Sequence, residues 1–286
     1  MLVENSSKLH PELDFHVVRR VYVEAGLDKN LKGELITSPF DLFSVEMLRD
    51  MHGLRFGDAL PTDVFVFGKG EPPHRDCTKV GGLPYWPAGK PWPRTGDGTT
   101  YHFLAQFNFA DSKDLFPDLP GDVLLLLTDG PEEWIEEPDR VRFEWLPLGL
   151  DPCAEFDPVV PCEFAGAFYG AIYRTADYLD AIDKAAEVDV SENFNLPILN
   201  GTKIGGFPHF IQPAEGLSGR FLCQLGSIQA EPHVPYPWVN QSMPLDGGFN
   251  KTGIHGESNE VCFADMGTVY VAMDSAGNLT HDFQCY

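Results

Sequence analysis

The sequence is poor in positive charge. It has 20 Lys and Arg against 43 Asp and Glu in 286 residues, which gives a formal net charge of -23. A nucleic-acid-binding protein needs a basic surface to displace the counterions around phosphate, and binding to a membrane surface needs a polybasic cluster. The aliphatic run at 123–127 is also far shorter than the about 20 apolar residues of a membrane helix. We therefore expect neither nucleic acid nor a membrane as a partner.

Signals for export and for disulfide or metal chemistry are also lacking. Residues 1–5 do not combine a basic stretch with an apolar one, as a secretory signal does, so we expect a cytoplasmic protein. The cysteines include no C-x-x-C pair, and this favours ordinary buried thiols over redox or metal roles. The six are Cys77, Cys153, Cys162, Cys223, Cys262 and Cys285.

No catalytic motif is present. The chain lacks H-E-x-x-H, G-x-S-x-G and the H-x-E with P-C-x-x-C of zinc deaminases, so we assign no catalytic residue, metal or cofactor. A nucleophilic pair formed only in the fold, such as Cys77 with His74 or His102, stays open.

The composition that is present favours a globular, turn-rich protein. Apolar residues make up 43% of the chain, enough for a substantial core, and the 28 Gly and 24 Pro exceed their usual share. A β-dominated fold is typical of such a composition.

Three short elements occur twice in the same order, which predicts an internal duplication. They are K-x-G-G-x-P at 79–84 and 203–208, F-L-x-Q at 103–106 and 221–224, and a Gly-led apolar strand at 121–126 and 267–272. The offsets between the copies are therefore 124, 118 and 146. One such unit would leave an apolar sheet face uncovered, so we expect the halves, about 76–190 and 191–286, to form one compact body.

Helical patterns accompany this duplication. Apolar residues at helical spacing predict helices at 12–25 and 38–53, and Thr175 suits the N-cap of a third helix at 175–190. Residues 64–67 (VFVF) predict a strand. The expected class is α+β: an N-terminal extension, 1–75, precedes a duplicated antiparallel domain, 76–286.

Several of these elements resemble the YwqG-like family, a domain of unknown function widespread in bacteria. The resemblance runs from residue 76 to 286 and rests on residues 78–87, 91–93, 102–106, 203–206, 263–267 and 284–286. It implies an α+β fold built from two similar β-rich halves and implies no catalytic residues. Some members look like immunity proteins encoded beside toxins, so the resemblance implies neutralisation of a toxin as one activity.

The glycine pairs of the K-x-G-G-x-P elements favour a structural role. A glycine-rich stretch beside a lysine can bind phosphate, but neither copy has the spacing of a known phosphate loop. Glycine permits positive φ, and the proline that follows blocks continuation of a ladder, so each copy is expected to turn the chain at a sheet corner. The glycines are Gly81, Gly82, Gly205 and Gly206.

Two glutamines and one aspartate are the other polar candidates. Gln106 and Gln224 lie in apolar strand patterns, where a buried amide can donate and accept hydrogen bonds across the interface between the halves. Asp265 is the best lone carboxylate for a site, although an Asp before a glycine is also a common turn former.

A pocket between the halves is the basis of the enzyme or small-molecule alternative. Lys79, Lys203 and Asp265 could converge there, although a salt bridge explains each lysine equally well. Trp86 and Trp92 lie in a Pro-rich loop, where they are either packed as a lid on the core or displayed as a recognition surface.

The acidic middle of the chain supports the leading hypothesis. Residues 129–163 hold eleven Asp and Glu against two Arg. Such a run is either a solvated face or a docking surface for a basic partner. We take it as the surface of a cytoplasmic protein-binding module, an immunity-type inhibitor of a basic toxin protein in the form that the resemblance implies. The candidate partner-binding residues are Glu132, Glu133, Trp134, Glu136, Glu137 and Asp139.

Overall fold

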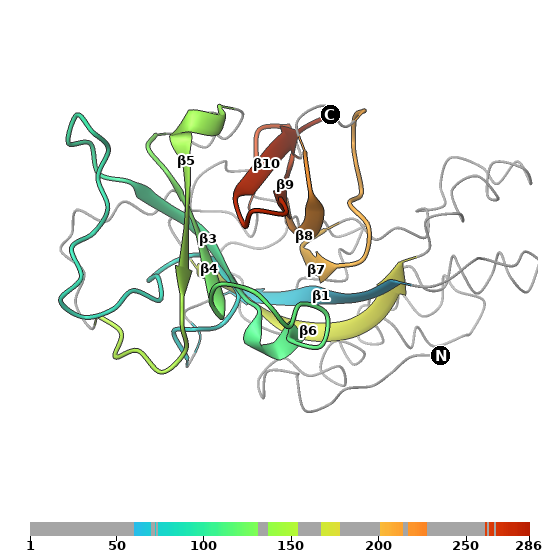
Figure 1. Cartoon of the computed structure of the whole chain (residues 1–286), viewed down its shortest axis with the longest axis horizontal. Helices are drawn as coiled ribbons and strands as arrows, with labels where there is room; N and C mark the ends of the chain where they lie inside the picture. Colours follow the sequence, from blue (N-terminus) through green and yellow to red (C-terminus); the bar gives the residue numbers. More distant parts are fainter. Residues whose placement is uncertain are drawn as a thin grey trace, which may run out of the picture.

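The protein folds into a ten-stranded antiparallel sheet (Figure 1), seen here in a computed structural model. The structure describes residues 60–69, 72, 74–130, 137–153, 167–177, 201–213, 217–227, 261, 263–265 and 267–286. The first strands are β1 (Leu60–Lys69), β2 (Lys79–Gly81), β3 (His102–Asn108), β4 (Val123–Thr128) and β5 (Val141–Leu146). The others are β6 (Ala167–Asp177), β7 (Lys203–Gly205), β8 (Arg220–Gly226), β9 (Thr268–Met273) and β10 (Leu279–Gln284).

The expected α+β class is wrong for the described part of the chain. Its only helical elements are two short 3-10 helices, η3 (Ala110–Ser112) and η5 (Pro138–Arg140). Thr175 does not cap a helix but lies in β6, opposite Thr62 of β1. Five of the eleven residues of β6 are aromatic or β-branched, and its long ladder with β1 outweighs the capping preference of one threonine. The predicted helices at 12–25 and 38–53, and the remainder of 175–190, fall outside the described residues.

The order of the strands shows two units of five strands, each of which contributes its first strand to the sheet of the other unit. The order is β10-β9-β8-β7-β1-β6-β2-β3-β4-β5. We call β1–β5 the first repeat and β6–β10 the second repeat. Among the described strands, β1 pairs only with β6 and β7, and β6 pairs only with β1 and β2. The predicted strand at 64–67 lies within β1, at the centre of the sheet, so the repeating units start at β1 and at β6.

The pairing registers of the two repeats are identical, which supports the duplication. Lys79 lies opposite Gln106 in the first repeat, and Lys203 lies opposite Gln224 in the second. The next ladder has a β-bulge at the same place in both copies, between Phe103 and Ala105 and between Phe221 and Cys223.

For the third repeated element, the structure pairs the two copies one residue away from the alignment that the sequence predicts. Gln106 lies opposite Leu125, and Gln224 lies opposite Tyr270, so Leu125 and Tyr270 are equivalent. The offset is therefore 145, and Asp122 of the first repeat corresponds to Gly267 of the second.

The ladder between β1 and β6 is symmetric about its own centre. Val64 lies opposite Tyr173, Gly68 lies opposite Tyr169, and Val66 lies opposite Ala171 midway between them. A pseudo-two-fold axis through this last pair relates the two repeats.

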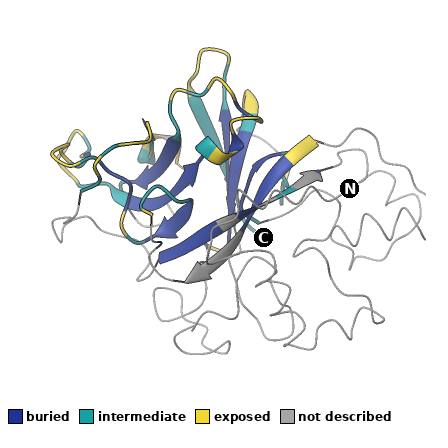
Figure 2. Ribbon diagram, turned by 90° about the horizontal axis from the view of Figure 1, so that it is seen from below, coloured by how far each residue is buried: buried dark blue, intermediate teal, exposed yellow. Residues whose placement is uncertain are grey.

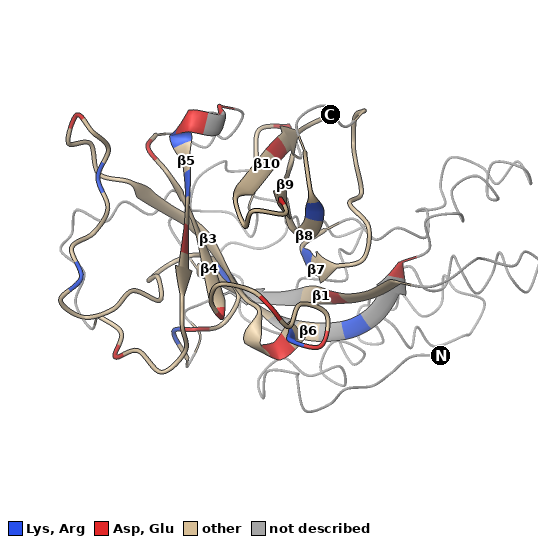
Figure 3. Ribbon diagram, viewed as in Figure 1, with Lys and Arg blue, Asp and Glu red and all other residues tan. Residues whose placement is uncertain are grey.

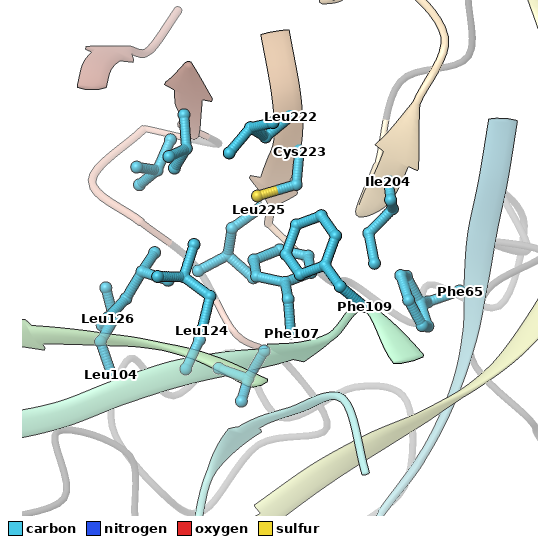
Figure 4. Packing of buried hydrophobic residues seen from close by; sticks show 14 of the residues in the cluster. Phe65, Leu104, Phe107, Phe109, Leu124, Leu126, Ile204, Leu222, Cys223 and Leu225 are labelled. Carbon is cyan, nitrogen blue, oxygen red and sulfur yellow. The ribbon is translucent and has the colours of Figure 1, made fainter. Parts of the chain in front are cut away.

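The main core lies between the two five-stranded layers that meet at the β1–β6 ladder. Figure 4 shows Phe107 and Leu124 of one layer beside Ile204 and Leu225 of the other. Burial follows the strands, whereas the exposed residues lie mostly in the connections (Figure 2). At the open edges, the ring of Phe143 in β5 lies 5.7 Å from that of His281 in β10.

Candidate functional site

The two glycine pairs form the same turn in both repeats. Gly81 and Gly82 have φ of 66° and 70°, and Gly205 and Gly206 have φ of 77° and 68°. These angles belong to the left-handed region, which strongly favours glycine. At Gly206 an added Cβ would lie 2.1 Å from the Asp177 Oδ2 atom, so a side chain is excluded there for a second reason.

Gln106 ties the turn of the first repeat to β3. Its side chain is fully buried. Its Oε1 accepts a hydrogen bond from the Tyr85 amide at 2.8 Å, and its Nε2 donates to the carbonyls of Arg75 at 2.7 Å and Cys77 at 2.8 Å. All three partners belong to the first repeat, so this glutamine does not bridge the two halves.

Gln224 plays the same part in the second repeat. It is also fully buried. Its Oε1 accepts from the His209 amide at 3.0 Å, and its Nε2 donates to the Gly201 carbonyl at 2.8 Å. His209 and Gly201 occupy the positions of Tyr85 and Cys77, so the two glutamines hold equivalent backbone groups.

Lys203 forms a buried ion pair inside the second repeat. Its Nζ lies 2.7 Å from Oδ2 of Asp177, and neither side chain is exposed. The same oxygen accepts the Phe207 amide at 2.9 Å. Burial lowers the pKa of the Lys203 ammonium, while the charge of Asp177 and its hydrogen bond oppose that effect. Without access to solvent, the pair has a structural role.

His209 lies next to this pair. Burial, and then the charge of Lys203, lower the pKa of its imidazole to about 4. Its carbonyl accepts a hydrogen bond from the Tyr270 hydroxyl at 2.5 Å. The imidazole is therefore neutral at physiological pH.

Lys79 has a different environment, although it occupies the position of Lys203. It is fully buried, and its ammonium donates to the Leu83 carbonyl. The two repeats therefore both bury a lysine at this position.

The structure does not bring the five residues of the expected pocket together. Lys79 in β2 and Lys203 in β7 are separated by β1 and β6, three strand spacings or about 14 Å. Asp265 has an exposed side chain, and its carbonyl accepts the Tyr286 amide at 3.0 Å.

Trp86 and Trp92 pack on the outer face of the first repeat. Their rings meet edge to face at 4.9 Å, and the indole of Trp86 is 2% exposed. Their Nε1 atoms donate to the carbonyls of Lys90 at 2.9 Å and Tyr101 at 2.7 Å. The geometry is that of a lid on the core.

The acidic segment, residues 129–163, is described at 129–130 and 137–153. Glu132, Glu133, Trp134 and Glu136 fall outside the described residues, whereas Glu137 and Asp139 lie at η5, where the chain enters β5 (Figure 3). The Glu137 side chain is 60% exposed, and that of Asp139 is exposed as well.

The fold uses one charged network that sequence reasoning missed. Arg174 of β6 donates through its guanidinium to Asp63 of β1 and to Asp114. Ser112 donates to the same Asp63 carboxylate at 2.6 Å. These hydrogen bonds raise the pKa of Arg174. A lone Asp in the apolar run of β1 was the signal for it, because a buried charge needs a partner.

Cys77 and Cys223 show no sign of activation. Burial raises the pKa of the Cys77 thiol to about 11 and that of Cys223 well above its ordinary value, so both stay protonated. Among the described residues, no three His, Cys, Asp or Glu side chains are placed to hold a metal ion. The same part of the chain contains no helix that is long and apolar enough to cross a membrane.

Comparison with known proteins finds a similarity in part of this sheet. Residues 78–142, from just before β2 into β5, match the model of a domain of unknown function, DUF1963. A search of curated proteins finds no match to the chain. The matched segment contains the first turn, Gln106 and the tryptophan loop, and the family's description carries no activity.

Proposed function

We propose that the chain is a YwqG-like protein-binding module that binds a basic protein through its acidic segment, residues 129–163. The cytoplasm is the compartment that we propose for this binding. Neutralisation of a basic toxin, as the family resemblance implies, is the form of binding that we favour.

The first support for this proposal is that the fold itself uses the repeated motif residues. The glycine pairs make turns, the two glutamines bind backbone groups, and Lys203 is neutralised by Asp177. A site that acts on a partner has to use groups that reach the surface.

The observation that carries the proposal is the exposure of two acidic residues at η5. Glu137 and Asp139 are exposed where the acidic run enters β5, the last strand of the sheet. Their carboxylates are therefore within reach of a partner protein.

The two arginines of this segment neutralise only some of its own carboxylates and leave an excess of nine negative charges. The Arg140 Nε donates to Glu137 at 2.7 Å, and its Nη1 lies 3.6 Å from Asp129. The Arg142 Nη2 donates to Glu144 at 3.0 Å. The other carboxylates then set the sign of the field that attracts a basic protein, over a Debye length of about 8 Å at physiological salt.

A pull-down from the native host tests the proposal. The bait is the full chain or its E133K/E136K variant, which spares Glu137 because that residue holds Arg140. The matched control is D118K/D265K, which makes the same change in net charge at two exposed aspartates outside residues 129–163. We expect a captured protein of basic composition that is lost with E133K/E136K, kept with the control and released by salt.

Equal recovery with both variants, at low and high salt, would contradict the proposal. The acidic segment would then be a solvated surface, and a small-molecule function would become the leading hypothesis.

A further inference from the structure

The two repeats meet along a ladder that neither can form alone. β1 and β6 pair over their full lengths, from Leu60 opposite Asp177 to Lys69 opposite Phe168. The second edge of β1 pairs with β7, and the second edge of β6 pairs with β2. Among the described strands, the backbone ladders of each first strand are thus formed only with strands of the other repeat.

Two arginines of the second repeat extend this interface to a segment of the first. Arg174 binds Asp63 and Asp114. Arg220 donates to the Leu115 carbonyl at 2.7 Å, and its guanidinium lies 4.4 Å above the ring of Phe116. Planar arginine groups that bind a carboxylate or stack on an aromatic ring fix orientation as well as contact.

The interface is also desolvated at its charged centre. The side chain of Asp63 is not exposed, and that of Arg174 is 11% exposed. Loss of the second repeat would leave a buried carboxylate with the Ser112 hydroxyl but without its arginine, and would open the edges of β1 and β2. Each repeat therefore presents a surface that is complementary to the other.

We infer that this surface of the first repeat binds the second repeat of another copy of the chain as it binds its own. Exchange between copies keeps every hydrogen bond across the interface, because only the connection between β5 and β6 takes a different route. The connection raises the effective concentration of each repeat at the other repeat of the same copy, and this favours the monomer. Cutting the connection removes that preference.

The test uses the full chain with a protease site, flanked by Gly/Ser spacers, inserted between Cys153 and Ala167. Two versions carry different terminal tags, and each is cut while folded. We expect the cut chain to elute at the volume of the uncut chain. After the two cut versions are mixed, unfolded in urea and refolded, hybrid pairs should be recovered in amounts similar to the original pairs.

A single substitution makes the test specific to the interface. In the cut chain, R174M should weaken association of the two repeats at least tenfold. The control R94M removes an exposed arginine that bonds to Gly98 in its own turn, and it should leave association unchanged. The inference is overturned if the cut repeats separate or precipitate, if only original pairs are recovered, or if R174M and R94M behave alike.

Discussion

The two repeats have the same backbone but different outer layers. In the first repeat the outer face is an apolar cluster that includes Val123, Leu125 and Leu146 under the tryptophan loop. The register places Thr268, Tyr270 and Gln284 at the same positions in the second repeat. A buried polar layer needs internal partners, and here the Gln284 Oε1 accepts the Gln212 amide at 2.8 Å.

The comparison shows which residues the backbone requires. The left-handed glycine pairs, the glutamine that holds the turn and the bulge recur in both copies, because the chain path depends on them. The layer that covers the outer face has more polar side chains in the second repeat than in the first.

The largest expected effect comes from the buried ion pair of Lys203 and Asp177 in the second repeat. D177N leaves Lys203 buried without a counter-charge and should lower the free energy of unfolding by about 3 to 5 kcal/mol. The double variant D177N/K203M removes both charges and keeps an acceptor for the Phe207 amide.

Urea denaturation of these two variants and the parent chain measures the difference. We expect the double variant to regain most of the loss. Equal stability of D177N and the parent would show that the pair does not stabilise the second repeat.

The next effect is a pH dependence that His209 confers on the second repeat. Its pKa is about 4 in the folded chain and about 6.5 when unfolded, so the unfolded state binds more protons between these values. The stability contribution is complete above pH 6.5 and is lost as the pH falls toward 4, by at most about 3 kcal/mol.

H209Y supplies the control, because Tyr85 occupies the same position in the first repeat. Thermal denaturation across pH 4 to 7 should show a shallower slope for this variant. An unchanged slope would mean that His209 is not the group that titrates.

A smaller effect is expected at the two glutamines. Q106L leaves one backbone amide and two carbonyls without the side chain that binds them, and Q224L leaves one amide and one carbonyl. Each should cost about 1 to 3 kcal/mol, with the larger loss for Q106L. Chemical denaturation of both variants checks the order, and a larger loss for Q224L would contradict this assignment.

The sequence reveals the local part of this fold. The three repeated elements indicate the duplication, and the β-branched and aromatic residues at 64–67 indicate β1. The exchange of β1 and β6 cannot be derived in this way, because it depends on which distant strand each one pairs with. For the same reason Thr175 suggests a helix cap, although tertiary pairing makes it part of β6.

The candidate site was harder to predict than the fold. Lys203 stands out in its motif, but its partner Asp177 is 26 residues away in sequence and belongs to no motif. The sequence also aligns β4 with β9 one residue away from the register of the structure. It matches Gly121 with Gly267, whereas Asp122 is the residue that corresponds to Gly267. Ion pairs and registers of this kind follow from long-range packing and leave little local pattern.

The exchange of first strands is the central claim, and cross-strand nuclear Overhauser effects in the full chain test it most directly. We expect contacts between backbone protons of Asp63 and Ile204 and of Val80 and Phe168, which pair across the repeats. Contacts from β1 to β2, in place of those to β7, would contradict the account, because each repeat would then form its sheet from its own strands.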